Sequence, residues 1–325
     1  MSTCAISVSV SRDPNTLKEI LSFLVDNFPD AYNWTYEYLN FRVRESAHTS
    51  TPGFFVVAID NSSKVIIGVL SVSFKDILGS KPLLIAELGD AYTKIKSYRS
   101  CEDLGDTFDV RLSHDIDLDY VKKSTFGALA FRIFTELDTI CPDVVVGYPN
   151  AIAIKSWTRR LGLSRLQALD IDYLKLPCLG FFLENSFPNA YAPTISQGYS
   201  PVFFTPSDSF DERIVKELEA RHGNGIKVVP LAAGLIATID GDRNFTLVYA
   251  DKQCKSTQFS RFLSILLNPR LKVLRLPMFL VPSIFRGFIP MRLRCHKPAV
   301  ARPNDVRCIK HSGILSNQIL FCDVP

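Results

Sequence analysis

Apolar residues in the first half of the chain recur with the two periods that distinguish helices from strands. Residues 15–27 carry them at three- and four-residue spacing, after Asp13 and Pro14, which suit a helix cap and a first turn. The same reasoning predicts further helices over 124–137, which Ser124 can cap, and over 150–161. It also predicts strands over 54–59, 65–74, 83–88 and 144–147, and an aromatic helix or loop over 33–45.

The second half of the chain repeats this mixture of helix and strand signals less clearly. It predicts strands over 202–205, 227–229, 234–239, 245–249 and 271–276, and helices over 208–221 and 256–267. The segment 240–242, Asp-Gly-Asp, is typical of a hairpin turn, and the proline-rich segment 180–201 is typical of a crossover. We therefore predict an α+β chain with two lobes of similar style, residues 1–178 and 179–325, the second smaller.

Charge is unevenly spread along the chain. With 325 residues, of which 47% are apolar, the protein has a globular composition and a net charge of only +4. Residues 270–311 contain ten Lys and Arg against one acid, a charge of +9, so the remainder carries −5. Residues 101–119 hold seven acids and one base and are predicted to be an acidic insertion in the first lobe. The basic segment could bind an anionic ligand, or it could be a solvated strand edge.

Several classes of protein are disfavoured by what the sequence lacks. None of the eight cysteines has C-x-x-C spacing, and no run of about 18 apolar residues could span a membrane. The sequence has no G-x-S-x-G, Walker-type loop, dinucleotide fingerprint or H-E-x-x-H, and its five histidines are scattered. We expect a cytoplasmic protein without a metal site, a membrane span or a nucleic-acid partner, although a Cys–His dyad formed in space stays open.

Three stretches of the first half carry a family resemblance. In order they are Glu-Leu-Gly-Asp-Ala-Tyr-Thr (87–93), Lys-Ser-Thr-Phe-Gly-Ala-Leu (123–129) and Gly-Tyr-Pro-Asn-Ala-Ile-Ala (147–153), followed by Leu-Gly-Leu (161–163). Together they resemble the GNAT-type acyltransferases, especially members with a Gly-x-Pro-Asn step that are found near bacterial surface-polysaccharide genes. The resemblance covers about residues 10–170 and implies a mixed sheet flanked by helices. The second lobe would be a degenerate copy of the same fold.

The resemblance implies acetyl-CoA or another acyl-CoA as co-substrate. A helix N-terminus attracts the pyrophosphate of such a ligand, and the resemblance places it at Lys123, Ser124, Thr125, Phe126 and Gly127. The amide-bearing arm would lie where strands 85–88 and 144–147 part, as an added strand would. Asn150 either caps the following helix or reaches an amide of the co-substrate.

Candidate catalytic residues lie at the end of the strand 83–88. The resemblance places the base there, at Glu87 or Asp90, and Glu87 is favoured because it follows an apolar run that would partly desolvate it. Tyr92 is a candidate proton donor, as are Tyr98 and Tyr148. The chain departs from the family pattern where two glycines of the phosphate turn are missing and where Trp157 replaces a tyrosine.

These observations predict an acyl-CoA-dependent N-acyltransferase. The expected partners are a small-molecule acyl donor and an amine acceptor, which the resemblance suggests is an amino group on a sugar nucleotide or glycan precursor. Two alternatives stay open. One is a non-catalytic module that binds an anionic partner, and the other is a tandem-lobe aminoacyl transferase similar to the Fem-type peptidoglycan enzymes.

Overall fold

The computed structural model divides the chain into two compact units. Unit 1 comprises residues 1–167 and 298–314, and unit 2 comprises residues 168–297 and 315–325. The residues described are 5–29, 34–43, 51–77, 83–98, 100–101, 112, 114–150, 152–167, 170–186, 227–231, 235–239, 244–250, 265–278, 281 and 288–305. The division differs from the expected boundary after residue 178, because residues 171–177 pair in the sheet of unit 2 and residues 300–301 pair in the sheet of unit 1.

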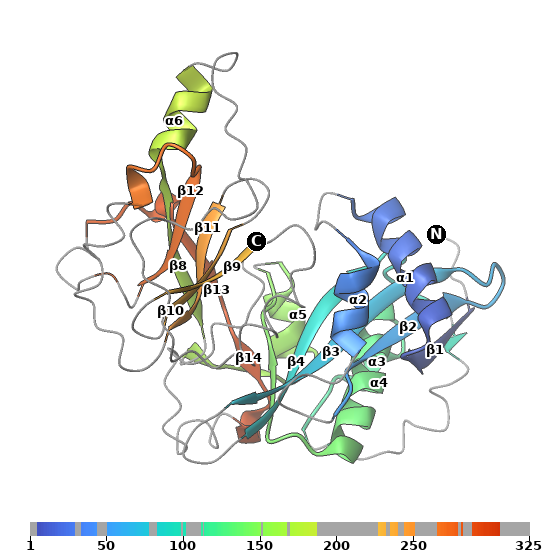
Figure 1. Ribbon diagram of the computed structural model, residues 1–325. Coiled ribbons are helices and arrows are strands. Elements are labelled where there is room, and N and C mark those ends of the chain that lie inside the picture. Colours follow the sequence, from blue (N-terminus) through green and yellow to red (C-terminus); the bar gives the residue numbers. More distant parts are fainter. Residues whose placement is uncertain are drawn as a thin grey trace. The chain divides into compact units, whose positions relative to one another are not determined.

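Unit 1 is built on a mixed sheet of eight described strands (Figure 1). Their spatial order is β5-β1-β2-β3-β4-β6-β14-β7, and the strand bounds are β1 (Ala5–Ser11), β2 (Phe54–Asp60), β3 (Ile66–Ile77), β4 (Leu83–Thr93), β5 (Ser100–Cys101), β6 (Val144–Gly147), β7 (Ser164–Arg165) and β14 (Val300–Ala301). Neighbours β1 to β4 are antiparallel, and β4 pairs with β6 in parallel. The predicted α+β class, with a mixed sheet flanked by helices, is confirmed.

Helices cover both faces of this sheet (Figure 1). On one face α1 (Pro14–Asn27) and α2 (Tyr36–Val43) pack over β2 and β3, with residues such as Leu24 and Phe55 in the core. On the other face α3 (Leu118–Val121), α4 (Thr125–Ile140) and α5 (Ile154–Arg159) share a second core, which includes Phe131 and Phe134 of α4. Burying each of these aromatic side chains is worth about 1.5–3 kcal/mol.

Two predicted helix caps are present in the structure, and one helix starts later than expected. Asp13 accepts a hydrogen bond from the Thr16 N–H at 2.9 Å, and Ser124 accepts one from the Gly127 N–H at 3.2 Å. The predicted helix over 150–161 is shorter, since α5 begins at Ile154. Asn150 instead stabilises the turn before it, because its side-chain oxygen accepts the N–H groups of residues 152 and 153.

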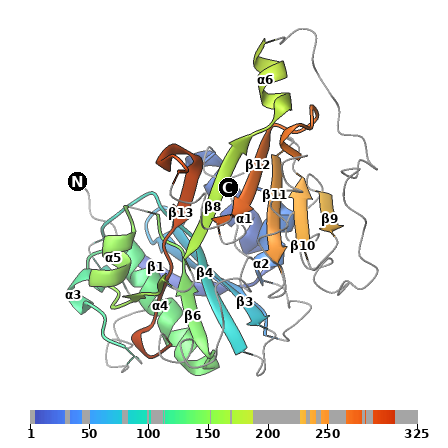
Figure 2. The same ribbon diagram turned by 90° about the vertical axis from the view of Figure 1, so that its left-hand side faces the viewer.

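Unit 2 has a mixed sheet of its own, whose strands lie side by side in Figure 2. Their order is β13-β8-β12-β11-β10-β9, with bounds β8 (Ile171–Pro177), β9 (Lys227–Leu231), β10 (Leu235–Ile239), β11 (Asn244–Ala250), β12 (Val273–Pro277) and β13 (Arg294–Lys297), accompanied by α6 (Leu179–Ser186) and the 3-10 helix η6 (Met291–Leu293). The predicted hairpin across 240–242 is confirmed by the antiparallel pairing of β10 with β11. The predicted elements over 202–205 and 208–221, and most of 256–267, lie outside the described residues.

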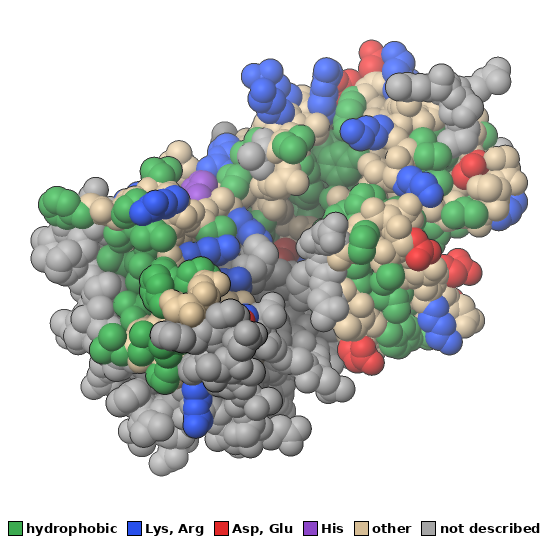
Figure 3. Space-filling model, turned by 90° about the horizontal axis from the view of Figure 1, so that it is seen from above, with side chains coloured by type: hydrophobic (Ala, Val, Ile, Leu, Met, Phe, Trp, Pro, Cys, Tyr) green, Lys and Arg blue, Asp and Glu red, His purple; other side chains and the backbone are tan. Residues whose placement is uncertain are grey.

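The structure describes the basic segment 270–311 more completely than the acidic segment 101–119. The basic segment 270–311 is divided between the units, and Arg302 is only 8% exposed within unit 1, so part of it is structural. Figure 3 shows the Lys and Arg side chains of one face distributed among hydrophobic and neutral ones. Most of the acidic segment lies outside the described residues, but Asp117 caps α3 by accepting the N–H of Tyr120 at 3.0 Å.

Candidate functional site

The site begins where strands β4 and β6 stop pairing. Their parallel register runs from Ile85 opposite Val144 to Leu88 opposite Gly147. Strand β6 ends there, whereas β4 continues to Thr93 and pairs over that stretch with β3. Among the described strands, none pairs with this last part of β4 on the β6 side. Within the described residues, 89–93 therefore form an open edge of β4, whereas the segments 85–88 and 144–147, which were expected to part, are paired along their whole length.

A β-bulge interrupts β4 at this open edge. Val69 faces Tyr92 and Ser71 faces Gly89, so two residues of β4, Asp90 and Ala91, face one residue of β3. Asp90 takes up the change in direction with a φ of +49°, in the left-handed region that few residues other than glycine adopt. Bulges redirect strands and side chains and are frequent beside active sites.

A buried polar cluster holds this bulge from the side of α2. Arg42, whose side chain is 2% exposed, forms an ion pair with Asp90, with Nε 3.0 Å from Oδ2, and its Nε donates a hydrogen bond to the Tyr38 hydroxyl oxygen at 3.1 Å. Asp90 also accepts the hydroxyl protons of Tyr38 and Ser71, at 2.9 and 2.7 Å. The Arg42 Nη1 donates to Ser73 Oγ at 2.9 Å and lies 3.8 Å from Glu87 Oε1. The predicted candidates Glu87 and Asp90 are thus brought together around one guanidinium.

The approach of Arg42 depends on glycine at position 89. A Cβ at Gly89 would lie 2.7 Å from Arg42 Nη2 and 3.4 Å from Ser71 Oγ, closer to the guanidinium than a side chain can come. The cluster holds two carboxylates and one guanidinium, all nearly excluded from water. Buried charges are tolerated only when paired and hydrogen-bonded, so this set of contacts defines one arrangement of the side chains.

Tyr92, the third predicted catalytic residue, belongs to an aromatic cluster on the same face. Its ring centroid lies 5.2 Å from that of Trp34 in an edge-to-face arrangement and 4.9 Å from that of Phe28. Tyr98 is buried and donates its hydroxyl proton to the carbonyl of Val121. This hydrogen bond anchors the ring to α3, and burial raises the pKa of the Tyr98 phenol.

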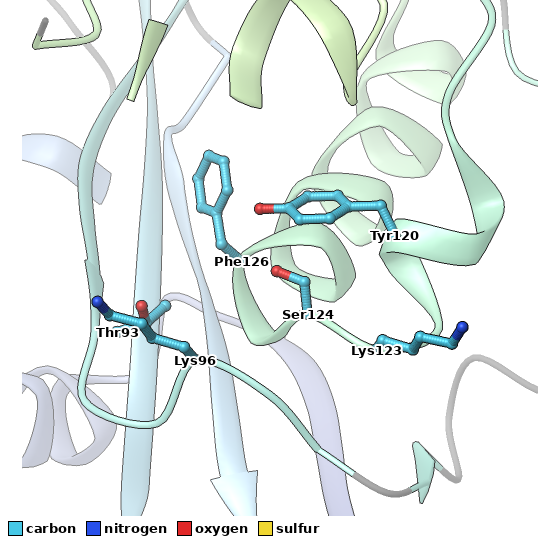
Figure 4. Close-up of a pocket in the computed structure, with 6 residues that line it drawn as sticks. All are labelled: Thr93, Lys96, Tyr120, Lys123, Ser124 and Phe126. Atoms are coloured by element: carbon cyan, nitrogen blue, oxygen red, sulfur yellow. The ribbon is translucent and has the colours of Figure 1, made fainter. Parts of the chain in front are cut away.

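A cavity of about 470 Å³ lies beside the start of α4. Its lining combines three of the predicted ligand-binding residues with three others: Lys123, Ser124 and Phe126 with Thr93, Lys96 and Tyr120. Figure 4 shows the rings of Tyr120 and Phe126 beside the Ser124 hydroxyl, while the two lysine side chains extend outward on opposite sides. The cavity has an aromatic wall and a basic rim, a combination suited to a ligand that carries both a ring and phosphate groups.

Part of the hydrogen-bonding capacity at the start of α4 is already used within the protein. The Thr125 N–H donates to the carbonyl of Lys96 at 3.1 Å, and the Gly127 N–H donates to Ser124. Gly127 meets a packing demand, because a Cβ there would lie 3.0 Å from the Cα of Val121 in α3. Thr125 and Gly127 were predicted to contact phosphate, but the structure places both in the core of the helix start rather than in the cavity lining.

Trp157 covers the end of β6. A Cβ on Gly147 would lie 2.3 Å from the Trp157 ring, so the indole rests directly on the strand, and the ring centroid of Phe126 lies 5.7 Å away. Trp157 is 3% exposed and belongs to the core on the α4 side. At the position where the resemblance expects a tyrosine, this chain therefore has a packing residue.

Sequence reasoning missed four residues of this region. Arg42 lies in a segment whose apolar pattern is weak, Lys96 and Tyr120 flank the predicted motifs, and Thr93 ends the first motif but was given no role there. The two lysines that follow β4, at positions 94 and 96, were the available signal for a basic rim. No group of three or more His, Cys, Asp or Glu side chains suited to a metal ion occurs in the part of the chain that the structure describes. None of its described helices is long and apolar enough to cross a membrane.

Comparisons with known proteins found similar solved structures at low sequence identity. No protein-family model matches the sequence, and no curated protein matches it. A conserved protein of unknown function and probable N-acyltransferase from Enterococcus faecalis V583 is similar in structure, with 9% identity, a TM-score of 0.47, and coverage of 94% of this chain and 75% of that one. A tandem GNAT protein from the clavulanic acid biosynthesis pathway is similar with 11% identity, a TM-score of 0.47, and coverage of 90% and 98%.

A third similar structure is a GCN5-related glucosamine N-acetyltransferase region of a fungal multi-domain GH3 β-N-acetylglucosaminidase. It shows 8% identity and a TM-score of 0.46, and the likeness covers 93% of this chain and 38% of that one. One of these three proteins is a tandem GNAT protein and one is a GCN5-related N-acetyltransferase region, and their likeness to this chain is one of fold alone.

Proposed function

We propose that unit 1 is an N-acyltransferase that takes its acyl group from acyl-CoA. The observation that carries the proposal is the open edge of β4, which begins where the parallel pairing with β6 ends at Leu88 and Gly147. Main-chain N–H and C=O groups along such an edge can bind an amide-bearing arm as they would bind an additional strand. Acyl-CoA has such an arm, and its thioester supplies an activated acyl group.

The cavity at the start of α4 is the proposed place for the nucleotide end of that ligand. Lys96 and Lys123 at its rim would attract the phosphates, and the rings of Tyr120 and Phe126 would contact the base. Asn150 would donate a hydrogen bond from its side-chain NH₂ group to an amide of the co-substrate, because its side-chain oxygen already accepts N–H groups of the following turn. The cavity and the open edge both involve the last residues of β4, so a single extended ligand could reach both.

Glu87 is the proposed base. Transfer to an amine requires a group that accepts the proton the nitrogen loses as it bonds to the acyl carbon. Glu87 is 5% exposed and lies 3.8 Å from the Arg42 guanidinium, next to the point where the pairing of β4 with β6 ends. Asp90 and Tyr92 would position the strand. For the acceptor we propose an amino group of a sugar nucleotide or a glycan precursor in polysaccharide biosynthesis, and for the location the cytoplasm.

The test is binding followed by turnover. Calorimetry should detect acetyl-CoA binding to the full chain, and release of free thiol should then be measured with a panel of UDP-linked amino sugars, free amino sugars and lysine peptides. Glu87→Gln should bind acetyl-CoA as the wild type does but release thiol at a rate lower by a factor of about 100 or more. Absence of any heat or thermal shift at millimolar acetyl-CoA would overturn the proposed function.

A second function is favoured by the internal hydrogen bonds at the start of α4. Because the N–H groups of Thr125 and Gly127 already have acceptors, the helix offers a phosphate fewer donors than an open N-terminus would. This observation fits a binding module that keeps the fold without catalysis and recognises an anionic partner. Absence of heat and thermal shift with millimolar acetyl-CoA, together with salt-sensitive binding of an anionic polymer such as heparin, would support the module over the enzyme.

A further inference from the structure

Side chains of helix α2 and of the neighbouring strand β3 hold the bulge in β4. Asp90 sits at a φ of +49°, a conformation for which glycine would carry less strain than aspartate. The side chain that aspartate adds is used on both oxygens, since it accepts hydrogen bonds from Tyr38 of α2 and Ser71 of β3 and forms an ion pair with Arg42 of α2. The carboxylate thus ties the strained residue of β4 to both a helix and the neighbouring strand.

Arg42 extends this attachment along β4. Its guanidinium forms an ion pair with Asp90, donates to Ser73 and lies close to Glu87, and it passes over Gly89 at a distance that no side chain at that position would allow. The residues it contacts on β4 are therefore on either side of Leu88, the last residue paired with β6. Arg42 holds the strand at the point where its open edge starts.

We propose that Arg42 and Asp90 are positioning residues that set the direction of the open edge of β4, and so the place of the acyl end of the co-substrate. This inference rests on the proposed function. An arm that pairs with residues 89–93 takes its register from that backbone, and the bulge decides where each N–H and C=O points. Loosening the clamp should therefore weaken binding of the arm, without affecting the nucleotide end at the start of α4.

Two ligands distinguish binding of the arm from binding of the nucleotide end. Acetyl-CoA carries the nucleotide, the arm and the acyl group, whereas 3′,5′-ADP carries only the nucleotide end. Asp90→Gly keeps a backbone that adopts positive φ readily but removes the carboxylate. We expect its Kd for acetyl-CoA to rise about tenfold or more while its Kd for 3′,5′-ADP stays within about twofold of wild type. Asp90→Asn, which retains an acceptor oxygen, should show a smaller rise, about threefold.

Lys64→Gly is the matched control. Lys64 also has a positive φ, +58°, but lies in the turn between β2 and β3. Its replacement by glycine should leave the Kd of both ligands unchanged. Arg42→Met should behave as Asp90→Gly does, and circular dichroism of each variant establishes that it is folded before titration.

The outcomes separate this inference from the function on which it rests. If wild-type protein binds no acetyl-CoA, the proposed function fails and the inference fails with it. If wild type binds acetyl-CoA but Asp90→Gly and Asp90→Asn bind both ligands as wild type does, the clamp does not position the arm. If the two Kd values rise together, the clamp only maintains the fold, and the positioning role is again excluded.

Discussion

Asp305 accepts a hydrogen bond from the backbone N–H of Val145 at 2.7 Å, although the two residues are 160 positions apart in the chain. The same carboxylate oxygen accepts Arg302 Nε at 2.9 Å, and the Arg302 guanidinium also donates to Asp138 at 3.0 Å and to the carbonyl of Pro142 at 3.1 Å. Together with β14, which lies between β6 and β7, these contacts complete unit 1 with residues from near the end of the chain.

Arg302 should therefore contribute strongly to the stability of unit 1. Arg302→Met leaves two buried or partly buried carboxylates, Asp305 and Asp138, without their guanidinium, and should lower the free energy of unfolding by about 3–5 kcal/mol in urea titrations. Arg132→Met is the control, because its ion pair with Glu136 is 28% and 30% exposed and should be worth about 1 kcal/mol or less. An equal loss of unfolding free energy in the two variants would contradict a structural role for residues 300–305 in unit 1.

His114 should make unit 1 less stable in mild acid. Burial, and next the nearby Arg302 guanidinium, lower the pKa of His114 below its usual 6.5. The unfolded chain then binds a proton more readily than the folded one, so the contribution of His114 is present above pH 6.5 and is lost as the pH falls through the folded pKa. Melting temperatures between pH 8 and 5 should fall on the acid side for wild type and fall less steeply for His114→Gln. Melting temperatures that fall equally with pH in the two proteins would refute the assignment of this acid sensitivity to His114.

The Thr125 hydroxyl is expected to be a destabilising group. It is fully buried and, within the described part of the chain, Oγ1 has no hydrogen-bond partner. Thr125→Val removes the unsatisfied hydroxyl and should raise the stability of unit 1 by about 1 kcal/mol, which corresponds to a rise of about 2–4 °C in melting temperature. Thr135→Val on the same helix should not do so, because Thr135 donates to the carbonyl of Phe131 at 3.0 Å. A lower melting temperature for Thr125→Val would indicate that its hydroxyl has a partner.

The basic rim of the cavity should act on the nucleotide end of the proposed ligand. Lys96→Glu and Lys123→Glu should each weaken binding of both acetyl-CoA and 3′,5′-ADP by about fivefold or more at low salt, since an opposite charge near 4 Å is worth about 1 kcal/mol in water. The effect should shrink as salt screens the charges. Lys18→Glu, an exposed position on α1, gives the same change in net charge and should leave both affinities unaltered. Equal weakening by all three variants would point to net charge rather than to the cavity.

Local signals in the sequence were sufficient for the elements with a clear period and a cap. The helices α1 and α4 occur where Asp13 and Ser124 predicted them, and β2, β3 and β6 lie where apolar runs predicted strands. The ends of the elements were predicted less accurately than their positions. Strand β4 extends five residues past the predicted end at Leu88, and helix α5 starts four residues after the predicted start at Asn150. The strands β7 and β14 contain two residues each, too few to show any period.

The sequence by itself determined the mixed class of the fold and the start of helix α4, because these depend on patterns within about ten to fifteen neighbouring positions. Only the tertiary structure decided that Arg42 joins Glu87 to Asp90, that Gly127 serves helix packing, and that Arg302 of the basic segment is an internal ion-pair partner. Each of these relations joins segments distant in sequence, where side-chain burial and hydrogen bonding, and not local propensity, determine which residues meet.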